Sequence, residues 1–375
     1  MTEIRIQNLP VMMQVNALLP IIENAKRLDV VLYRNMVTGL VGQKVNDETW
    51  NLLSKAYADG SLLGTAIDDT PAGHKYAEEF LGFAETQMFD SDSDILEIGC
   101  GTGYLASLMT RMNKKVVCIE PSAQNEKDWS ARNLDVRVGF FPEVLEPGER
   151  FDVVYSCSVL EHFRDVDTHL KDCLKHLKPK GKLLIAIPDC EKYFSLADPS
   201  VILHEHISYF TEQSLNNTLV AAGLEVLEIS KSAYGSVLFA SAIASKKTKT
   251  VRIDQFKLDP ESFFLRNVQK KLSDLSKLIS LKQDEGIQLG IYCPGRAYNV
   301  ITDCSGIRFF DDDLNLHGKF YPIWSNPIES FQNLIEEPVD EVWIFSSAFG
   351  NIIAERIQKA MPYINVKTLD QILIN

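Results

Sequence analysis

Three alternating glycines, Gly99, Gly101 and Gly103, are the residues of this sequence whose spacing most clearly suits a chemical role. A short apolar run at 95–98 comes directly before them, and an apolar segment with helical spacing, 104–112, comes directly after. This order predicts a strand, a tight turn and a helix. Glycine can take backbone dihedrals that are closed to other residues, and it lets a ligand lie against bare main chain at a helix N-terminus. The turn is therefore expected to bind a nucleoside.

A carboxylate at the end of the next predicted strand supports this expectation. Glu120 stands near the roughly 20-residue offset at which an acidic side chain accepts hydrogen bonds from ribose hydroxyls. Two nucleosides fit the glycines themselves. The pattern G-x-G-x-x-A, formed by Gly101, Gly103 and Ala106, suits a dinucleotide, whereas E-x-G-x-G-x-G, which begins at Glu97, suits S-adenosylmethionine. The glycines alone leave both open.

A second group of titratable residues stands in the segment 202–210, where His204, Glu205, His206 and Tyr209 lie within six residues. This segment follows a predicted strand, and open α/β sheets bind their ligands beyond the carboxyl ends of strands. An imidazole can act as a base near neutral pH, and a neighbouring carboxylate can hold or charge-balance it. His-x-His supplies only two metal ligands, and no partner cluster with metal-site spacing is evident, so no metal is predicted. The alternative is a structural turn before the next helix.

The glycine turn and the segment 202–210 can lie together only at one edge of a sheet. The apolar segments of the sequence predict such a sheet. Seven strands are expected, at 95–98, 116–119, 135–138, 151–156, 182–187, 224–230 and 236–244. The fourth and fifth are nearly all apolar, as strands covered on both faces must be, and the last two form an antiparallel pair. A helix at 71–89 is expected to pack onto this sheet, and residues 1–75 are expected to form a small α+β lobe with a helix at 48–58. The predicted fold class is α/β with a doubly wound sheet.

Composition limits the partners of such a domain. The 375 residues suffice for two or three domains, and 45% apolar content suffices for their cores. Asp and Glu number 51 against 38 Lys and Arg, a formal net charge of −13 without a basic block, which disfavours nucleic acid as a partner. The seven cysteines are scattered and form no C-x-x-C pair, so they are expected to be reduced core residues. No long apolar run or secretion signal is evident, and a soluble cytoplasmic protein is predicted.

Two later segments decide between the nucleosides. Residues 151–162 and 177–188 resemble the fourth and fifth strand regions of class I methyltransferases, which favours S-adenosylmethionine as the cofactor. Phe140 or Phe141, in Gly-Phe-Phe-Pro after the third strand, is expected either to stack on the adenine or to belong to the core. The resemblance implies nine cofactor-binding residues: Glu97, Gly99, Gly101, Gly103, Tyr104, Glu120, Pro121, Phe141 and Ser158.

The order of motifs along the chain resembles a narrower family, the nucleotide-sugar C-methyltransferases of deoxysugar biosynthesis. His-Glu-His-Ile-Ser-Tyr-Phe, 204–210, follows the methyl-donor segment as it does in that family. The family's third, Rossmann-like domain is matched by Tyr-Cys-Pro-Gly-Arg-Ala at 292–297, Asp-Asp-Asp-Leu-Asn-Leu-His-Gly at 311–318 and Val-Trp-Ile-Phe-Ser at 342–346. The resemblance covers most of residues 75–375.

This resemblance implies a mechanism. A C–H group beside a ketone loses its proton to a base, and the enolate attacks the sulfonium methyl group. His206 would be the base, with Glu205 orienting it or stabilising its charged form. His204 or Tyr209 would hydrogen-bond the enolate oxygen. Substrate contacts would come from Tyr57, which begins a polar loop reaching Asp69, from His162, and from Arg296, which would bind a diphosphate or another anion.

The sequence also departs from the family. An N-terminal lobe with paired zinc-binding cysteines is typical of the family, but no cysteine precedes Cys100 here, and Asn35 and Thr38 stand near the expected ligand positions. Leu203 replaces an aromatic residue, and Arg296 replaces a lysine. Three segments are predicted: a zinc-less lobe at 1–75, a methyltransferase domain at 76–248, and a helix at 260–283 with a C-terminal Rossmann-like domain within 249–375.

The leading functional hypothesis is therefore an S-adenosylmethionine-dependent methyltransferase of a small, sugar-like and anionic metabolite, with C-methylation favoured. Methylation of oxygen or nitrogen needs only the same donor site and an oriented nucleophile. Two other classes remain: a non-catalytic carbohydrate-pathway protein and an NAD-dependent oxidoreductase. No membrane partner is expected, and the oligomeric state is not predicted.

Overall fold

The computed structural model describes residues 3–11, 26–58, 71–87, 93–111, 115–245 and 259–374. Its contacts divide the chain into two compact units. The seven-stranded unit comprises Arg34–Asp189 and Glu205–Lys257, and the five-stranded unit comprises Met1–Tyr33, Cys190–His204 and Leu258–Asn375. The three predicted segments differ from this grouping, because the contacts divide the first of them after Tyr33 and assign a stretch from the middle of the chain to the five-stranded unit. The predicted boundary at 248 and the polar loop to Asp69 fall largely outside the described residues.

The sheet of the seven-stranded unit has the order β10-β11-β8-β7-β4-β5-β6. Its strands are β4 (Asp94–Ile98), β5 (Lys115–Glu120), β6 (Asp135–Val138), β7 (Phe151–Cys157), β8 (Leu177–Pro188), β10 (Leu224–Lys231) and β11 (Val237–Ala244). All neighbours pair in parallel except β11, which runs antiparallel to both β8 and β10. The predicted seven-stranded α/β sheet is confirmed, and β8 begins five residues before the predicted start at Lys182.

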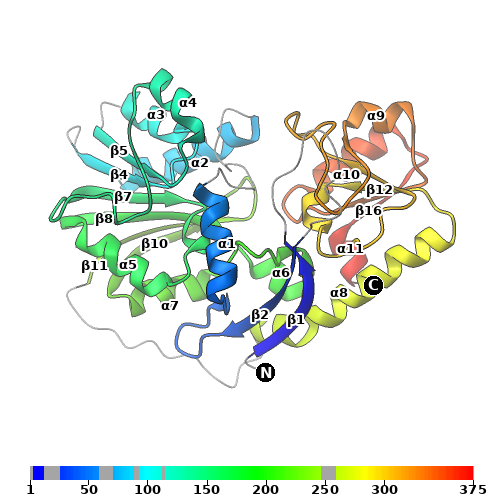
Figure 1. Ribbon diagram of the computed structural model, residues 1–375, viewed down its shortest axis with the longest axis horizontal. Coiled ribbons are helices and arrows are strands. Elements are labelled where there is room, and N and C mark those ends of the chain that lie inside the picture. Colours follow the sequence, from blue (N-terminus) through cyan, green and yellow to red (C-terminus); the bar gives the residue numbers. More distant parts are fainter. Residues whose placement is uncertain are drawn as a thin grey trace. The chain divides into compact units, whose positions relative to one another are not determined.

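Helices cover both faces of this sheet because the central strands are apolar on both sides. Figure 1 shows α3 (Tyr104–Arg111) and α4 (Glu126–Arg132) on one face and α5 (Val166–Lys175) and α7 (Glu212–Ala221) on the other. α2 (Pro71–Gln87) packs on the side of α3, where Phe80, Phe83 and Ala84 join the core. The parallel strands therefore place their carboxyl ends at one edge, where the glycine turn begins α3.

Short elements near residue 40 complete this unit. β3 (Val41–Gln43) pairs antiparallel with β9 (Ser208–Tyr209), and α1 (Asp47–Ala58) follows. The preceding turn lies where the family resemblance placed zinc ligands. In this turn the Asn35 side-chain oxygen accepts hydrogen bonds from the backbone N–H groups of Val37 and Thr38 at 2.8 and 3.1 Å, and Gly39 adopts a φ of 82°. Side-chain and backbone hydrogen bonds close this turn.

The five-stranded unit contains a parallel sheet of order β14-β13-β12-β15-β16. Its strands are β12 (Leu289–Tyr292), β13 (Ile307–Phe310), β14 (Ile328–Glu329), β15 (Glu341–Ile344) and β16 (Asn365–Thr368). Core contacts place α8 (Pro260–Asp284) and α11 (Leu369–Ile374) on one face and α9 (Phe331–Glu336) and α10 (Gly350–Ala360) on the other. The remaining elements of this unit are β1 (Glu3–Pro10), which pairs antiparallel with β2 (Arg27–Arg34), and α6 (Glu191–Leu196).

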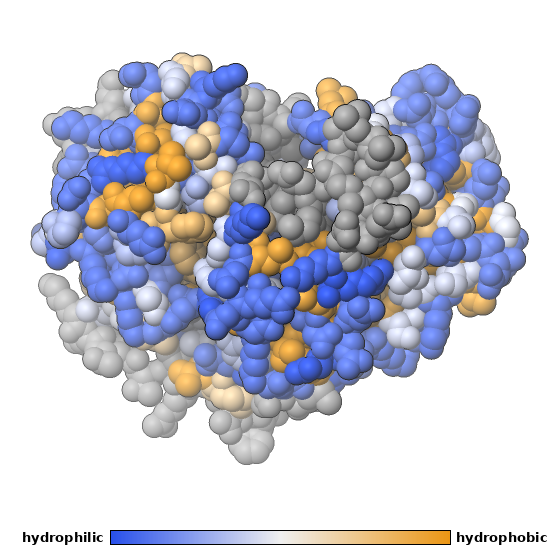
Figure 2. Space-filling view, viewed as in Figure 1, coloured by the Kyte–Doolittle hydropathy of each residue, from blue (hydrophilic) through white to orange (hydrophobic). Residues whose placement is uncertain are grey.

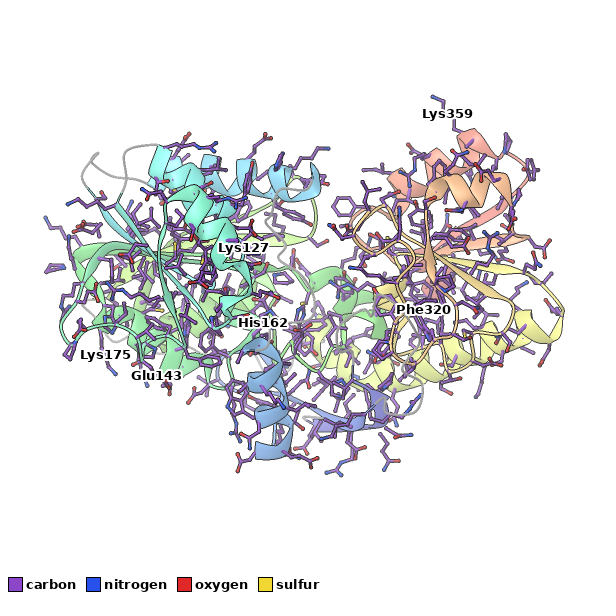
Figure 3. All side chains as sticks on the ribbon, turned by 45° about the horizontal axis from the view of Figure 1, so that its top comes forward. Lys127, Glu143, His162, Lys175, Phe320 and Lys359 are labelled. Carbon is purple, nitrogen blue, oxygen red and sulfur yellow. The ribbon has the colours of Figure 1, made fainter. Side chains whose placement is uncertain are left out.

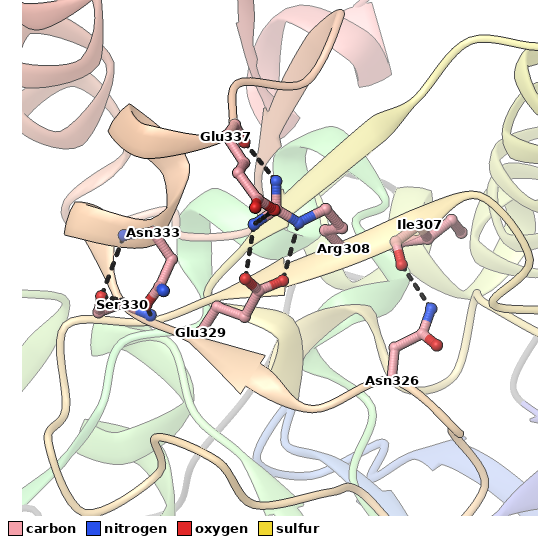
Figure 4. Close-up of polar contacts among 7 residues, drawn as sticks. All are labelled: Ile307, Arg308, Asn326, Glu329, Ser330, Asn333 and Glu337. Carbon is pink, nitrogen blue, oxygen red and sulfur yellow. Dashed lines mark hydrogen bonds and ion pairs between the residues drawn. The ribbon is translucent and has the colours of Figure 1, made fainter.

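An ion pair fastens the short edge strand β14 to β13. Figure 4 shows Arg308 forming a fork with the Glu329 carboxylate, with Nε–Oε1 and Nη2–Oε2 distances of 2.8 and 2.5 Å, and donating to the Glu337 carbonyl. In the same view, Asn326 donates to the Ile307 carbonyl at 2.6 Å. These contacts fix the edge of the sheet at its most weakly paired strand.

The surface fits the acidic composition. On the face shown in Figure 2, hydrophilic residues predominate among the described residues, and apolar side chains lie in small groups. None of the seven cysteines forms a disulfide, and four of them are buried, in line with the predicted reduced core residues. Within the described ranges, no helix is both long and apolar enough to cross a bilayer.

Candidate active site

The glycine turn between β4 and α3 has the geometry that the sequence predicts. Gly99, Gly101 and Gly103 have φ angles of 74°, 52° and 74°, values in the left-handed region that glycine adopts without strain. Two of the turn positions also have no room for a side chain. A Cβ at Gly99 would lie 2.6 Å from the Val159 side chain, and one at Gly103 would lie 2.4 Å from Leu134. The backbone of the turn is therefore bare at the N-terminus of α3.

Two side chains hold this turn from outside. Glu120 ends β5, and its carboxylate accepts hydrogen bonds from the backbone N–H groups of Gly101 at 2.9 Å and Ser122 at 3.4 Å. Burial raises the pKa of Glu120, while these two N–H groups lower it. On the opposite side, Trp129 of α4 donates its indole N–H to the Gly101 carbonyl at 2.7 Å. Both hydrogen bonds meet at Gly101, so Glu120 and Trp129 together orient its peptide groups.

Two other residues that were predicted to bind the cofactor, Glu97 and Tyr104, differ in their surroundings. Glu97 is 3% exposed, and burial raises its pKa to about 8 while Tyr155 and the Ala106 N–H lower it. Its carboxylate therefore lies beneath the turn. Tyr104 stacks on His74 with ring centroids 4.9 Å apart.

Three further residues that were predicted to bind the cofactor lie along the same edge of the sheet. Ser158 follows β7 with a φ of 55°, and Pro121 is half-buried after β5. Phe141 packs into the core against His169 and His176, so Phe140 is the more exposed aromatic residue of the pair. This placement favours the core alternative for Phe141.

A cluster of titratable side chains lies on the same edge, next to the glycine turn. We call it the acceptor cluster: Tyr57, Glu161, His162, Glu205 and His206. Tyr57 comes from α1, and Glu161 and His162 from a 3-10 turn (Leu160–His162) two residues beyond the Val159 that contacts Gly99. Figure 3 shows His162 among packed side chains, whereas Lys175 projects outward.

Backbone hydrogen bonds bring the cluster's distant segments together. The Ile207 N–H donates to the Glu161 carbonyl at 2.8 Å, which places 205–207 beside the 3-10 turn. Gln43 of β3 donates through its side-chain amide to the His206 carbonyl and to the Tyr209 hydroxyl, both at 2.7 Å. The paired strands β3 and β9 therefore fix the position of His206.

Hydrogen bonds also assign the tautomer of His162. Its Nδ1 lies 2.9 Å from the Glu205 carbonyl oxygen, which can only accept, so Nδ1 carries the proton. The Tyr57 hydroxyl oxygen lies 2.8 Å from the same nitrogen, and its O–H points to Glu205 Oε2 at 3.5 Å. In this tautomer the lone pair is on Nε2, which lies 3.9 Å from Glu161 Oε1. The ring of His206 meets that of His162 edge-on, with centroids 5.0 Å apart.

Similarity to known proteins identifies the part of the chain that holds both sites. A family model described as "Methyltransferase domain" matches residues 71–229, which include the glycine turn, Glu120, Glu161 and His206. This part of the chain is therefore similar to a methyltransferase domain and has the class I methyltransferase fold. The sheet order and the single antiparallel strand of the seven-stranded unit agree with this fold.

The methyltransferase domain is similar to curated relatives over part of their length. It is 31% identical over 151 residues to a protein named ubiquinone biosynthesis O-methyltransferase from Azorhizobium caulinodans, covering 36% of this chain and 60% of that protein. A protein of the same name from Rhodopseudomonas palustris is 34% identical over 150 residues, covering 36% and 59%. This chain thus spans about 60% of the length of these relatives.

Solved structures show the same partial similarity. The N-methyltransferase NodS from Bradyrhizobium japonicum, in complex with S-adenosyl-L-homocysteine, matches with a TM-score of 0.40 and 17% identity over 54% of this chain and all of that one. A methyltransferase from Thermotoga maritima, described as a possible histamine N-methyltransferase, matches with a TM-score of 0.37 and 20% identity over 46% of this chain and 90% of that one.

Burial shifts the pKa values of three residues in the acceptor cluster. It raises the pKa of Glu161 to about 8, with repulsion from Glu205 acting in the same direction, and lowers the pKa of His162 to about 4. Burial also raises the pKa of the Tyr57 hydroxyl, followed by the charge of Glu205. Each shift favours the neutral form, because the low-dielectric surroundings penalise charge.

The remaining predicted residues have other contacts. His204 belongs to the five-stranded unit, where it is buried and its ring contacts the Leu28 carbonyl at 3.4 Å. Arg296 belongs to the same unit, and its guanidinium lies over the Tyr193 ring and lowers the pKa of the buried Asp198, which burial raises to about 6. Tyr209 is 1% exposed, with its hydroxyl accepting from Gln43.

Sequence reasoning missed three positioning residues. Glu161 was not singled out, although it precedes His162 in a 3-10 turn that follows β7, beside the glycine turn. Gln43 and Trp129 carried no signal in a single sequence, because their hydrogen bonds join segments 163 and 28 residues apart. Only the sheet brings these segments into contact.

Proposed function

We propose that this chain transfers a methyl group from S-adenosylmethionine to a small, sugar-like acceptor whose reacting carbon lies beside a carbonyl group. The acceptor cluster is the observation that supports this proposal. Its imidazoles, carboxylates and phenol lie next to the glycine turn at the same edge of the sheet, and they are mostly buried. A site that only binds the donor needs no such set of proton-exchanging groups.

The proposed reaction is a proton removal followed by a methyl transfer. His206 receives the proton from the carbon beside the carbonyl, and the resulting enolate attacks the sulfonium methyl group. The S–CH₃ bond breaks as the C–CH₃ bond forms, and S-adenosylhomocysteine leaves. Tyr57, which contacts His162 and Glu205, would turn its O–H from Glu205 to donate a hydrogen bond to the enolate oxygen.

Methylation of a hydroxyl oxygen is the second candidate. It is favoured by the names of the relatives, which are ubiquinone biosynthesis O-methyltransferases. The same proton acceptor would then take a hydroxyl proton, and the new bond would be O–CH₃. The two reactions would use the same residues of the acceptor cluster, so the methylated product distinguishes them.

Product analysis with labelled donor tests the proposal. Incubation with ¹³C-methyl S-adenosylmethionine and candidate keto-sugars, followed by NMR of the product, distinguishes a methyl group on carbon from one on oxygen. We expect His206→Asn to lower the rate of methyl transfer by about 10²–10⁴ while leaving donor affinity nearly intact. His176→Asn is the matched control, since His176 lies outside the cluster and contacts the Glu149 carbonyl. Full turnover by His206→Asn would refute the role of this residue.

A further inference from the structure

We infer that Glu161, His162 and His206 form a binding site for one divalent transition-metal cation, which would bind an oxygen atom of the acceptor. This inference rests on the proposed function for the kind of acceptor, and it revises one role within it. A metal-bound His206 is a ligand, and the Glu205 carboxylate would then accept the proton of the acceptor in its place.

The spacing of the three side chains supports a shared ion. One carboxylate oxygen of Glu161 and one ring nitrogen from each histidine all lie within 4.8 Å of one another. Ligand atoms about 2 Å from the same ion lie about 3–4 Å apart, so side-chain shifts of under about 1 Å would close the site. The sequence analysis found only the two ligands of His-x-His, because Glu161 and His162 are brought beside His206 only by the Ile207–Glu161 hydrogen bond.

The Glu161 carboxylate provides a second, independent observation. It is 1% exposed, and neither of its oxygens accepts a hydrogen bond from another described residue. A buried carboxyl group without hydrogen-bond partners is costly, whereas a coordinated cation would replace its proton and bind its lone pairs. No lysine or arginine of the described residues forms an ion pair with Glu161.

The tautomer of His162 provides a third observation. Metal-binding histidines usually donate their other ring N–H to a backbone carbonyl or a carboxylate, which orients the ring and directs the lone pair to the metal. His162 has this arrangement, since Nδ1–H donates to the Glu205 carbonyl and Nε2 faces Glu161. The hydrogen bond from Gln43 to the His206 carbonyl fixes the backbone of His206.

The three ligand side chains determine which cations the site would prefer. Two imidazoles and one carboxylate suit Mn²⁺, Fe²⁺, Co²⁺ or Zn²⁺ and leave coordination positions open, whereas Mg²⁺ and Ca²⁺ prefer oxygen ligands. An acceptor with adjacent oxygens, such as a carbonyl beside a hydroxyl, could fill two open positions. The cation would then lower the pKa of the bound group and stabilise its anion.

Direct binding of Mn²⁺ tests the site without any acceptor. Mn²⁺ is chosen because it has little affinity for thiols, and the chain has seven. Electron paramagnetic resonance of the full chain, after chelation and dialysis, is expected to show one bound Mn²⁺ per chain, with Mg²⁺ in excess failing to displace it. Glu161→Gln and His206→Asn should each weaken binding at least about tenfold. Glu205→Gln, which alters the cluster but not the ligand set, should retain it.

Donor affinity and melting temperature of each variant show that the domain remains folded. Absence of stoichiometric Mn²⁺ or Co²⁺ binding by the unaltered chain would overturn the inference, as would Glu161→Gln binding Mn²⁺ as tightly as the unaltered chain. If the chelated chain methylates its acceptor at an undiminished rate, the cation has no role and the proposed function stands. If the chain binds Mn²⁺ at these residues but methylates no small acceptor, the site stands and the proposed function fails.

Discussion

Replacement of Glu120 tests the donor site most directly. Its carboxylate accepts the Gly101 N–H at 2.9 Å and is expected to accept the ribose hydroxyls of the donor as well. Loss of hydrogen bonds to a charged acceptor costs about 1.5–3 kcal/mol. Glu120→Ala should therefore raise the Kd for S-adenosylhomocysteine about 10- to 150-fold.

Glu120→Gln tests the contribution of the carboxylate charge separately from that of the hydrogen bond to Gly101. The amide oxygen can still accept the Gly101 N–H, so the turn keeps its shape while the ribose loses a charged partner. We expect a smaller loss, of about 1 kcal/mol or roughly fivefold in Kd. The structure predicts that affinity decreases from the unaltered chain to Glu120→Gln and then to Glu120→Ala.

Isothermal titration calorimetry with S-adenosylhomocysteine measures these affinities, and thermal unfolding shows whether the turn is intact. Glu143→Ala is the matched control, because it removes an exposed carboxylate from the same domain with the same change in net charge. Unchanged affinity in Glu120→Ala would refute the assignment of the ribose contact. A loss of equal size in Glu143→Ala would show that net charge, and not the hydrogen bonds, governs binding.

Three further predictions concern packing and stability. Trp129→Phe removes the hydrogen bond to the Gly101 carbonyl, and it should weaken donor binding by about 1 kcal/mol in the same calorimetric assay; equal affinity would show that the indole N–H does not orient the turn. His169 is buried with a pKa lowered to about 3, so below pH 6.5 the unfolded chain binds a proton that the native chain excludes, and the free energy of unfolding falls with pH down to about 3. His169→Phe should flatten the urea-unfolding profile in this range by up to about 1.4 kcal/mol per pH unit, and an unaltered slope would contradict this account. Arg308→Ala breaks the half-buried fork with Glu329 and should lower the free energy of unfolding by about 1–2 kcal/mol, with partial recovery in Arg308→Lys; a loss below about 0.3 kcal/mol would mean that solvent screens the pair.

Local patterns in the sequence predicted most of the methyltransferase domain. Strand β6 has the predicted bounds 135–138, and the glycine turn begins α3 as expected. The helix expected at 260–283 corresponds to α8, Pro260–Asp284. These features are readable because strand runs, helical spacing and glycine turns depend on neighbouring residues along the chain.

The acceptor cluster was predicted only in part. Residue types and position indicated Glu205 and His206, and the family resemblance implied roles for Tyr57 and His162. Their mutual contacts join α1, the turn after β7 and the segment before β9. Glu161 gains its significance from those contacts, since a single carboxylate in a sequence carries no sign that it will be buried without partners.

Tertiary structure alone decided three matters. It placed Phe141 in the core, grouped His204 with the five-stranded unit and Glu205 with the other, and joined Glu161 and His162 to His206. Each depends on the pairing or packing of segments far apart in the chain. The sequence by itself determined the elements and the donor turn, because their signals are local; which side chains meet at the end of the sheet depends on burial and hydrogen bonds between strands, and those exist only in the folded chain.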